Sequence, residues 1–325
     1  MKKTLSLKIQ KNIIASFLYF DTLDISPTAL QLWRMCLDMG KIRGEVAHQM
    51  RPREASLRDV IFFLDDWEKK GVILCENGSY ILTKKYERFA KRRLSIKYSD
   101  EKRVRIKKWI ALFRYIPFIR AIILTGGVAS QCADKKSDWD VLIITAPRRI
   151  WTARALMAFC THFFGKRRYG IYTKDRFCLN HFITETSLDM RTRDVYSAKE
   201  YAFALPLCNQ KLFEEFIKNN LWMRSFFPFW EMSRTQPIQC LSQGKYGEKI
   251  QRFFERLLSW DALEDILRLW QKKKIQKNPK TRLPGSYIVA EDEALIFLPK
   301  PHGPKVFEKF KRSIFEYEQE KRFQR

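Results

Sequence analysis

Two short apolar runs separated by a polar loop constrain this chain more than any other feature of its sequence. The first run ends in Gly126-Gly127, and the second begins with Asp138 and Asp140. In a strand, residues two apart project from the same face, so the two carboxylates would point the same way. Residues 121–145 are therefore expected to form two strands of one sheet, with paired acids at the start of the second.

The paired acids predict a metal site. Two neighbouring carboxylates raise each other's pKa unless a cation lies between them. Hard oxygen ligands suit Mg²⁺, or Mn²⁺ in its place, held by one or two carboxylates together with substrate phosphates. Glycines have no Cβ, so their backbone N–H groups can approach a phosphate closely. Asp138 and Asp140 are the expected metal ligands, and Gly126 and Gly127 the expected phosphate-binding turn.

In this stretch the chain resembles the DNA polymerase β-like nucleotidyltransferases. Their signature is an apolar strand, Gly-Gly or Gly-Ser, a spacer, and Asp-x-Asp on the next strand, which Gly126-Gly127 and Asp138-Trp139-Asp140 match. The resemblance implies Mg²⁺-dependent transfer of a nucleoside monophosphate from a nucleoside triphosphate such as ATP to an acceptor. RNA, protein and small molecules remain open as acceptors. An ordinary turn whose acids cap the surface is the alternative.

Three further residues complete the expected site. Ser130 follows the glycine turn, and Arg154 lies in the first turns of a helix expected from residue 150, where it would meet a triphosphate or simply cap a surface. The superfamily places a third acid on the next strand, but residues 177–183 contain none. Asn180 is the polar residue best placed to stand in, with Asp189 as a later candidate. Because Asn is a poor base, a catalytically degenerate protein that binds nucleotide or nucleic acid is the alternative function.

Residues 1–83 are expected to form a winged helix. Helices are expected at residues 13–18, from Ser26-Pro27 and from Ser56, followed by two apolar runs joined at Asn77-Gly78, a strong hairpin signal. Such domains often bind DNA through the third helix. Here that helix carries acids, which favours a protein-docking or structural role: Asp59, Asp65, Asp66 and Glu68.

Residues 84–116 are expected to form a basic helical connector. The chain holds 62 Lys and Arg against 36 Asp and Glu, a net charge of +26 that attracts polyanions. The connector is either a solvated linker or a track for RNA or DNA. Its basic residues include Lys84, Lys85, Arg88, Lys91, Arg92, Arg93, Arg103, Arg105, Lys107 and Lys108.

The expected fold class is α/β (α+β). A small mixed-sheet nucleotidyltransferase core spans residues 117–206, and residues 207–325 form a helical region with a short hairpin at 287–297. Helices are expected at residues 197–205, 212–227 and 250–270, and the aromatic cluster at 222–230 is expected in the core rather than as a nucleobase platform.

Most of the chain also resembles bacterial nucleotidyltransferase-domain proteins with an N-terminal winged helix. The matching segments are Tyr19-Phe20-Asp21, Ile116-Pro117-Phe118, the glycine and acid motif, Trp151 with Arg154, and Cys178-Leu179-Asn180.

Composition limits the cellular setting. No apolar run approaches the roughly 20 residues that cross a bilayer, and the first residues lack the apolar core of a signal peptide. A cytoplasmic protein with no membrane partner is expected. Its seven cysteines are scattered, which is not typical of a disulfide framework or a zinc site.

Overall fold

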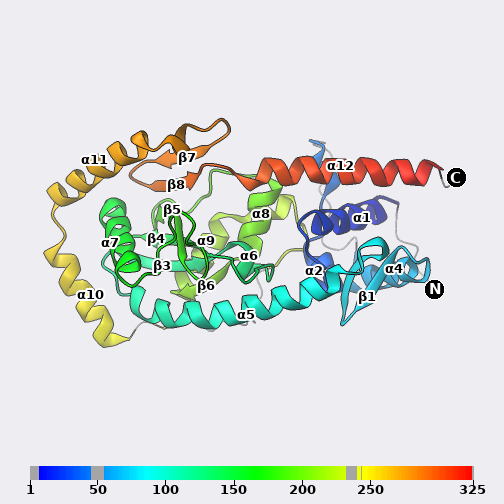
Figure 1. Cartoon of the computed structure of the whole chain (residues 1–325), viewed down its shortest axis with the longest axis horizontal. Coiled ribbons are helices and arrows are strands. Elements are labelled where there is room, and N and C mark those ends of the chain that lie inside the picture. The colour runs from blue at the N-terminus through cyan, green and yellow to red at the C-terminus, as the bar shows by residue number, and fades with distance from the viewer. Residues whose placement is uncertain (1–6, 45–54, 232–239, 243, 324–325) are drawn as a thin grey trace.

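A mixed six-stranded sheet forms the centre of the molecule. The structure is a computed structural model that describes residues 7–44, 55–231, 240–242 and 244–323. The strand order is β6-β3-β4-β5-β8-β7, and a separate two-stranded sheet lies in the N-terminal region (Figure 1). The predicted α/β (α+β) class is confirmed. The strands are β3 (Ile119–Leu124), β4 (Trp139–Thr145), β5 (Phe177–Thr184), β6 (Leu205–Cys208), β7 (Tyr287–Ala290) and β8 (Ala294–Leu298).

Helices cover both faces of this sheet. Strand β3 runs antiparallel to β4 and β6, whereas β4 and β5 are parallel and are connected through α7 (Ile150–Phe163). One face packs against α7 and α5 (Arg88–Phe113). The other face packs against α8 (Val195–Ala202), α9 (Gln210–Asn219), α12 (His302–Phe323) and α1 (Leu7–Thr22). Because Trp139 faces the α5 side, Asp138 and Asp140 belong to the α8 side of the sheet.

The N-terminal region has the expected order of helices followed by a hairpin. It contains α1, α2 (Ala29–Arg34), a short α3 (Met39–Ile42), α4 (Leu57–Lys69), and strands β1 (Ile73–Glu76) and β2 (Ser79–Leu82). Ser56 caps α4, and Asn77 and Gly78 turn the hairpin with positive φ, as predicted. The second helix begins later than predicted, because Thr28 makes the capping box and leaves Pro27 outside. The apolar residues of the N-terminal region share one core with the α8 side of the sheet.

Helix α5 is part of the core, not a solvated linker. In Figure 1 it runs from the N-terminal region along the sheet. Ile106, Ile110 and Phe113 are buried against the sheet. Arg92, Lys102 and Arg103 are only 6%, 2% and 8% exposed, because their long side chains reach inward to backbone carbonyls. The solvated-linker interpretation is therefore wrong for these three residues.

The C-terminal region differs from expectation in three places. Leu205 begins strand β6 instead of ending a helix. The single helix predicted at 250–270 is two helices, α10 (Lys245–Leu257) and α11 (Asp261–Lys277). The predicted hairpin exists as β7 and β8, and it extends the central sheet by pairing β8 with β5. Helix α9 is shorter than predicted, but the aromatic residues that follow it are in the core as expected: Phe226, Phe227, Phe229 and Trp230.

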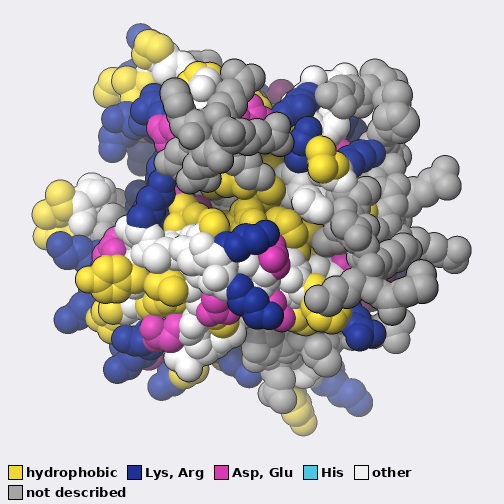
Figure 2. All heavy atoms as spheres, turned by 90° about the vertical axis from the view of Figure 1, so that its right-hand side faces the viewer, with side chains coloured by type: hydrophobic (Ala, Val, Ile, Leu, Met, Phe, Trp, Pro, Cys, Tyr) yellow, Lys and Arg dark blue, Asp and Glu magenta, His cyan; other side chains and the backbone are white. Residues whose placement is uncertain are grey.

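The described helices and one face of the surface bear on the predicted partners. Among the described residues, no helix has both the length and the apolar character needed to span a membrane. Figure 2 shows Lys and Arg side chains scattered over the drawn end of the molecule, among acidic and apolar ones. Among the described residues of that face, the basic side chains do not gather in one patch.

Candidate metal and nucleotide site

The glycine turn lies directly on the acid-bearing strand. Gly126 begins the short helix α6 (Gly126–Ala129) with φ +69°, a conformation that side chains disfavour. A Cβ at Gly126 would lie 2.4 Å from Asp140 Oδ2, whereas one at Gly127 would meet nothing closer than 3.7 Å. Thr125 N–H also donates to the carbonyl of Asp140 (3.0 Å). The first glycine is therefore required by the approach of Asp140.

The two predicted metal ligands lie together. Asp138, Asp140 and Cys178 each offer a ligand atom, all within 4.8 Å of one another. Arg168 donates to Asp138 Oδ2 (2.5 Å) and to Cys178 Sγ (3.2 Å). Burial raises the pKa of Asp140 to about 7, and the negative charges of Asp138 and Glu200 add to this. Two acids share one arginine here, so a divalent cation would relieve the remaining repulsion.

On β5 the residue opposite Asp140 is Cys178, whereas Asn180 was expected as the polar residue best placed to stand in for a third acid. In the parallel pairing, Asp140 is opposite Cys178 and Leu142 is opposite His181. Val141 of β4 alone thus lies opposite Leu179 and Asn180 of β5, which is a bulge that contains Asn180. Asp189, the later candidate, is exposed and forms an ion pair with Arg193.

Helix α8 supplies two charged residues that the sequence analysis missed. Gly126 N–H donates to Glu200 Oε2 (3.0 Å), and Lys199 Nζ donates to Glu200 Oε1 (2.9 Å) and Ser130 Oγ (3.4 Å). Lys199 is only 5% exposed. These residues line a cavity of about 250 Å³ together with Gly127 and Tyr196. Tyr196, Lys199 and Glu200 stand at i, i+3 and i+4, a spacing that marks one face of a helix and was the available signal.

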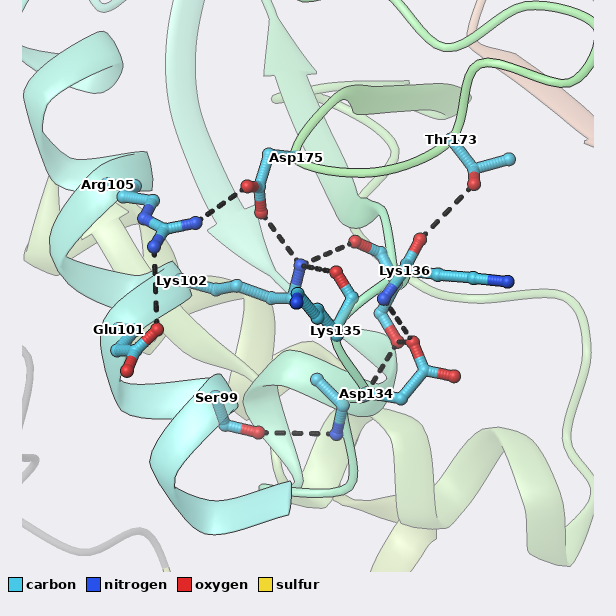
Figure 3. Close-up of polar contacts among 11 residues, drawn as sticks. Ser99, Glu101, Lys102, Arg105, Asp134, Lys135, Lys136, Thr173 and Asp175 are labelled. Carbon is cyan, nitrogen blue, oxygen red and sulfur yellow. Dashed lines mark hydrogen bonds and ion pairs between the residues drawn. The ribbon is translucent and has the colours of Figure 1, made fainter. Parts of the chain in front are cut away.

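Helix α5 holds the loop between the glycine turn and β4. Lys102 Nζ donates to the carbonyl of Ser137 (2.8 Å) and to Asp175 (2.7 Å), and Ser99 accepts from the N–H of Ala133 (3.2 Å) (Figure 3). Arg103, the residue after Lys102, donates to the carbonyls of Val128 (3.2 Å) and Ala129 (2.8 Å). The basic residues of α5 therefore fix the spacer of the motif.

Arg154 and Asn180 line a different cavity from the glycine turn. That cavity, of about 560 Å³, lies among α7, α11, β5 and the β7–β8 hairpin, and neither Asp138 nor Asp140 lines it. Arg154 donates to Gln271 and stacks its guanidinium over Phe297 at 4.6 Å. The structure thus brings together Gly126, Gly127, Ser130, Asp138 and Asp140, and places Arg154 and Asn180 on the α7 side.

Comparison of the chain with protein-family models, with curated proteins and with solved structures gave no match in any of the three.

Proposed function

We propose that this protein is a Mg²⁺-dependent nucleotidyltransferase that moves a nucleoside monophosphate from a nucleoside triphosphate to an acceptor. The observation that carries the proposal is the contact between Gly126 and Asp140, in which a positive-φ glycine lies against a carboxylate paired with Asp138. This combines backbone donors for phosphate with hard oxygen ligands for a cation in one corner. The donor set fits Mg²⁺ or Mn²⁺, because Asp138 and Asp140 offer hard carboxylate oxygens within 4.8 Å of one another.

Asp138 and Asp140 would hold the cation, which when bound stabilises charge on the attacking and leaving oxygens. The acceptor oxygen forms a bond to the α-phosphorus, the bond from that phosphorus to the pyrophosphate oxygen breaks, and the acceptor's proton passes to a base or to water. The glycine turn would hold the phosphates, with Lys199 and Ser130 in the cavity beside it. For a phosphate to use the N–H of Gly126, Glu200 must release it.

A second function, nucleotide binding without transfer, is favoured by one observation. Cys178 occupies the strand position beside Asp140, and a buried thiol whose pKa burial raises above its ordinary value is no substitute for a carboxylate. Glu200 is the third carboxylate whose charge acts on Asp140, and it comes from α8 instead of β5. Transfer therefore depends on whether Glu200 serves in that role.

Incubation with each labelled triphosphate, Mg²⁺ or Mn²⁺, and total RNA distinguishes these functions. Label that becomes covalently attached to RNA, to the protein or to a small molecule supports transfer. Mg²⁺-dependent binding with no attached label supports the binding-only function, and no Mg²⁺-dependent binding of any triphosphate contradicts both.

The partner and setting belong to the same proposal. Most basic residues of α5 are used within the chain, so an RNA or DNA acceptor would contact the exposed Lys108 and the half-buried Lys107. We place the protein in the cytoplasm, because all seven cysteines are free thiols and reduced cysteines are typical of that compartment.

A further inference from the structure

The larger cavity has the size of a small-molecule site. Its volume of about 560 Å³ falls within the roughly 300–1,000 Å³ typical of ligand pockets. Helix α7 forms one wall, α11 another, and strands β5, β7 and β8 the third; Figure 1 shows where these elements lie. Aromatic and apolar side chains provide flat surfaces within it, namely Phe159, Trp270, Ile275, Ile288 and Phe297.

The lining of this cavity contains cations but no carboxylate. Five cations line it, and among the described residues only one of them, Arg168, forms an ion pair, with Asp138 at 2.5 Å. Arg154 and Arg167 are half-buried, and a partly buried charge without an ion-pair partner is costly, so proteins usually pair it or use it for a ligand. The lining cations are Arg154, Arg167, Arg168, Lys274 and Lys280.

Of these cations, Arg154 is the one that neighbouring side chains hold in place while one of its donors stays unused. Its Nε is buried and has no hydrogen-bond partner. Its NH1 donates to Gln271, whose own amide is fixed by donation to the carbonyl of Trp151 (2.8 Å). Burial, with Arg167 nearby, lowers the pKa of Arg154 to about 10, so the guanidinium is still charged at neutral pH. An anion held between Arg154 and Arg167 would offset the repulsion between the two like charges.

The cavity also adjoins the candidate metal site. Cys178 and Arg168 line the cavity, and the same two side chains contact the acid pair from the other side. A ligand in the cavity would therefore have one end near Arg168, next to the carboxylates. This placement suits a molecule that reacts at that corner.

We infer that this cavity binds a phosphorylated small molecule, with a phosphate group held by Arg154 and Arg167 and its organic part against Trp270 and Phe297. Its role as the acceptor rests on the proposed function, but its binding does not. The cavity's volume suits a molecule about the size of a mononucleotide and not a folded nucleic acid.

Calorimetric titration with inorganic pyrophosphate, in EDTA to remove divalent cations, tests the site. The full chain should bind pyrophosphate, and Arg154→Gln and Arg167→Gln should each weaken binding about tenfold or more, as expected for a lost charge-assisted hydrogen bond. Arg148→Gln removes the same charge from an 83% exposed side chain outside the cavity and should leave binding unchanged. Lys280→Gln, at an exposed position of the lining, provides a variant that cannot disturb buried packing.

Three outcomes would overturn the inference. The first is no pyrophosphate binding by the unaltered protein, and the second is equal weakening by Arg148→Gln, which would mean non-specific attraction to net charge. The third is preference for a 5′-phosphorylated RNA that pyrophosphate does not displace. Asp138→Asn separates this site from the proposed function, because it should abolish Mg²⁺-dependent triphosphate binding and leave pyrophosphate binding in EDTA intact.

Discussion

A cluster of acids on the α8 side of the sheet and a cluster of arginines on the α7 side adjoin each other at Arg168 and Cys178. On the α8 side, Asp138, Asp140 and Glu200 gather near the glycine turn; Arg168 pairs with Asp138 and Lys199 with Glu200, whereas Asp140 has no ion pair among the described residues. On the α7 side, Arg154 and Arg167 line a cavity without an acid. Unmatched charge of this kind marks places where a ligand is expected to complete the structure.

The cations of α5 show the contrasting arrangement. Lys102 and Arg105 both pair with Asp175, and Arg88 pairs with Asp21 and Asp24. These cations are matched by acids within the chain and position the N-terminal region and the spacer loop. Charge that is matched internally is structural, and charge that is not matched is available for binding.

The largest expected effect is on stability, at a matched cation. Lys102→Ala should destabilise the protein by about 3 kcal/mol, because Asp175 and two loop carbonyls lose a buried charged partner. Chemical denaturation measures it, with the exposed Lys108→Ala as control. Equal stability of Lys102→Ala and Lys108→Ala would contradict the structural role of α5.

The next effect distinguishes the two glycines. Gly126→Ala should cost about 2 kcal/mol and abolish Mg²⁺-dependent triphosphate binding, since positive φ and the 2.4 Å approach to Asp140 both exclude a methyl group. Gly127→Ala has room for its methyl group at 3.7 Å and should remain close to the parent in stability. If the two variants lose stability equally, the turn does not lie on Asp140 as described.

A pH dependence follows from Asp140. Its pKa is raised to about 7 in the folded state from 3.8, so the folded chain binds more protons and stability falls as pH rises from about 4 to 7. Buried His181, whose pKa burial lowers to about 4, acts oppositely: stability falls as pH drops from 6.5 toward 4. Between about pH 4 and 6.5 the effects of Asp140 and His181 on stability oppose each other. The informative quantity is therefore the difference in stability between the parent and Asp140→Asn.

Melting temperatures from pH 4 to 8 measure that difference. Asp140→Asn should gain stability over the parent as pH rises, and saturating Mg²⁺ should remove most of the gain by stabilising the parent. A difference that does not vary with pH would mean that Asp140 titrates normally.

The smallest expected effect concerns the third ligand position. Cys178→Asp should strengthen Mg²⁺ binding about tenfold, because it adds a carboxylate where the three ligand atoms converge. Asn180→Asp introduces the same charge into the bulge and should change Mg²⁺ affinity less. The reverse order of affinities would restore Asn180 as the position beside the acid pair.

Local features of the fold were predictable from the sequence. The glycine and Asp-x-Asp pattern located β3 and β4, Asn77-Gly78 located the hairpin, and Ser56 located a helix cap. Each of these signals lies within a few residues, where backbone preferences dominate.

Features that depend on distant contacts were not predictable. Glu200 meets Gly126 across 74 residues, and Arg103 reaches the carbonyl of Val128 across 25. The position of Cys178 depends on a bulge that no residue type in β5 signals. Arg154 was correctly placed on a helix, but its cavity exists only because α11 folds back over α7.

The central claim is that Asp138 and Asp140 jointly hold a cation that a triphosphate also contacts. Calorimetric titration of a nucleoside triphosphate mixture, with Mg²⁺ and again in EDTA, tests this on the parent, Asp138→Asn and Asp140→Asn. We expect Mg²⁺-dependent binding in the parent, its loss in both variants, and melting temperatures of the variants no lower than that of the metal-free parent. Mg²⁺-dependent affinity that is unchanged in both variants would contradict it.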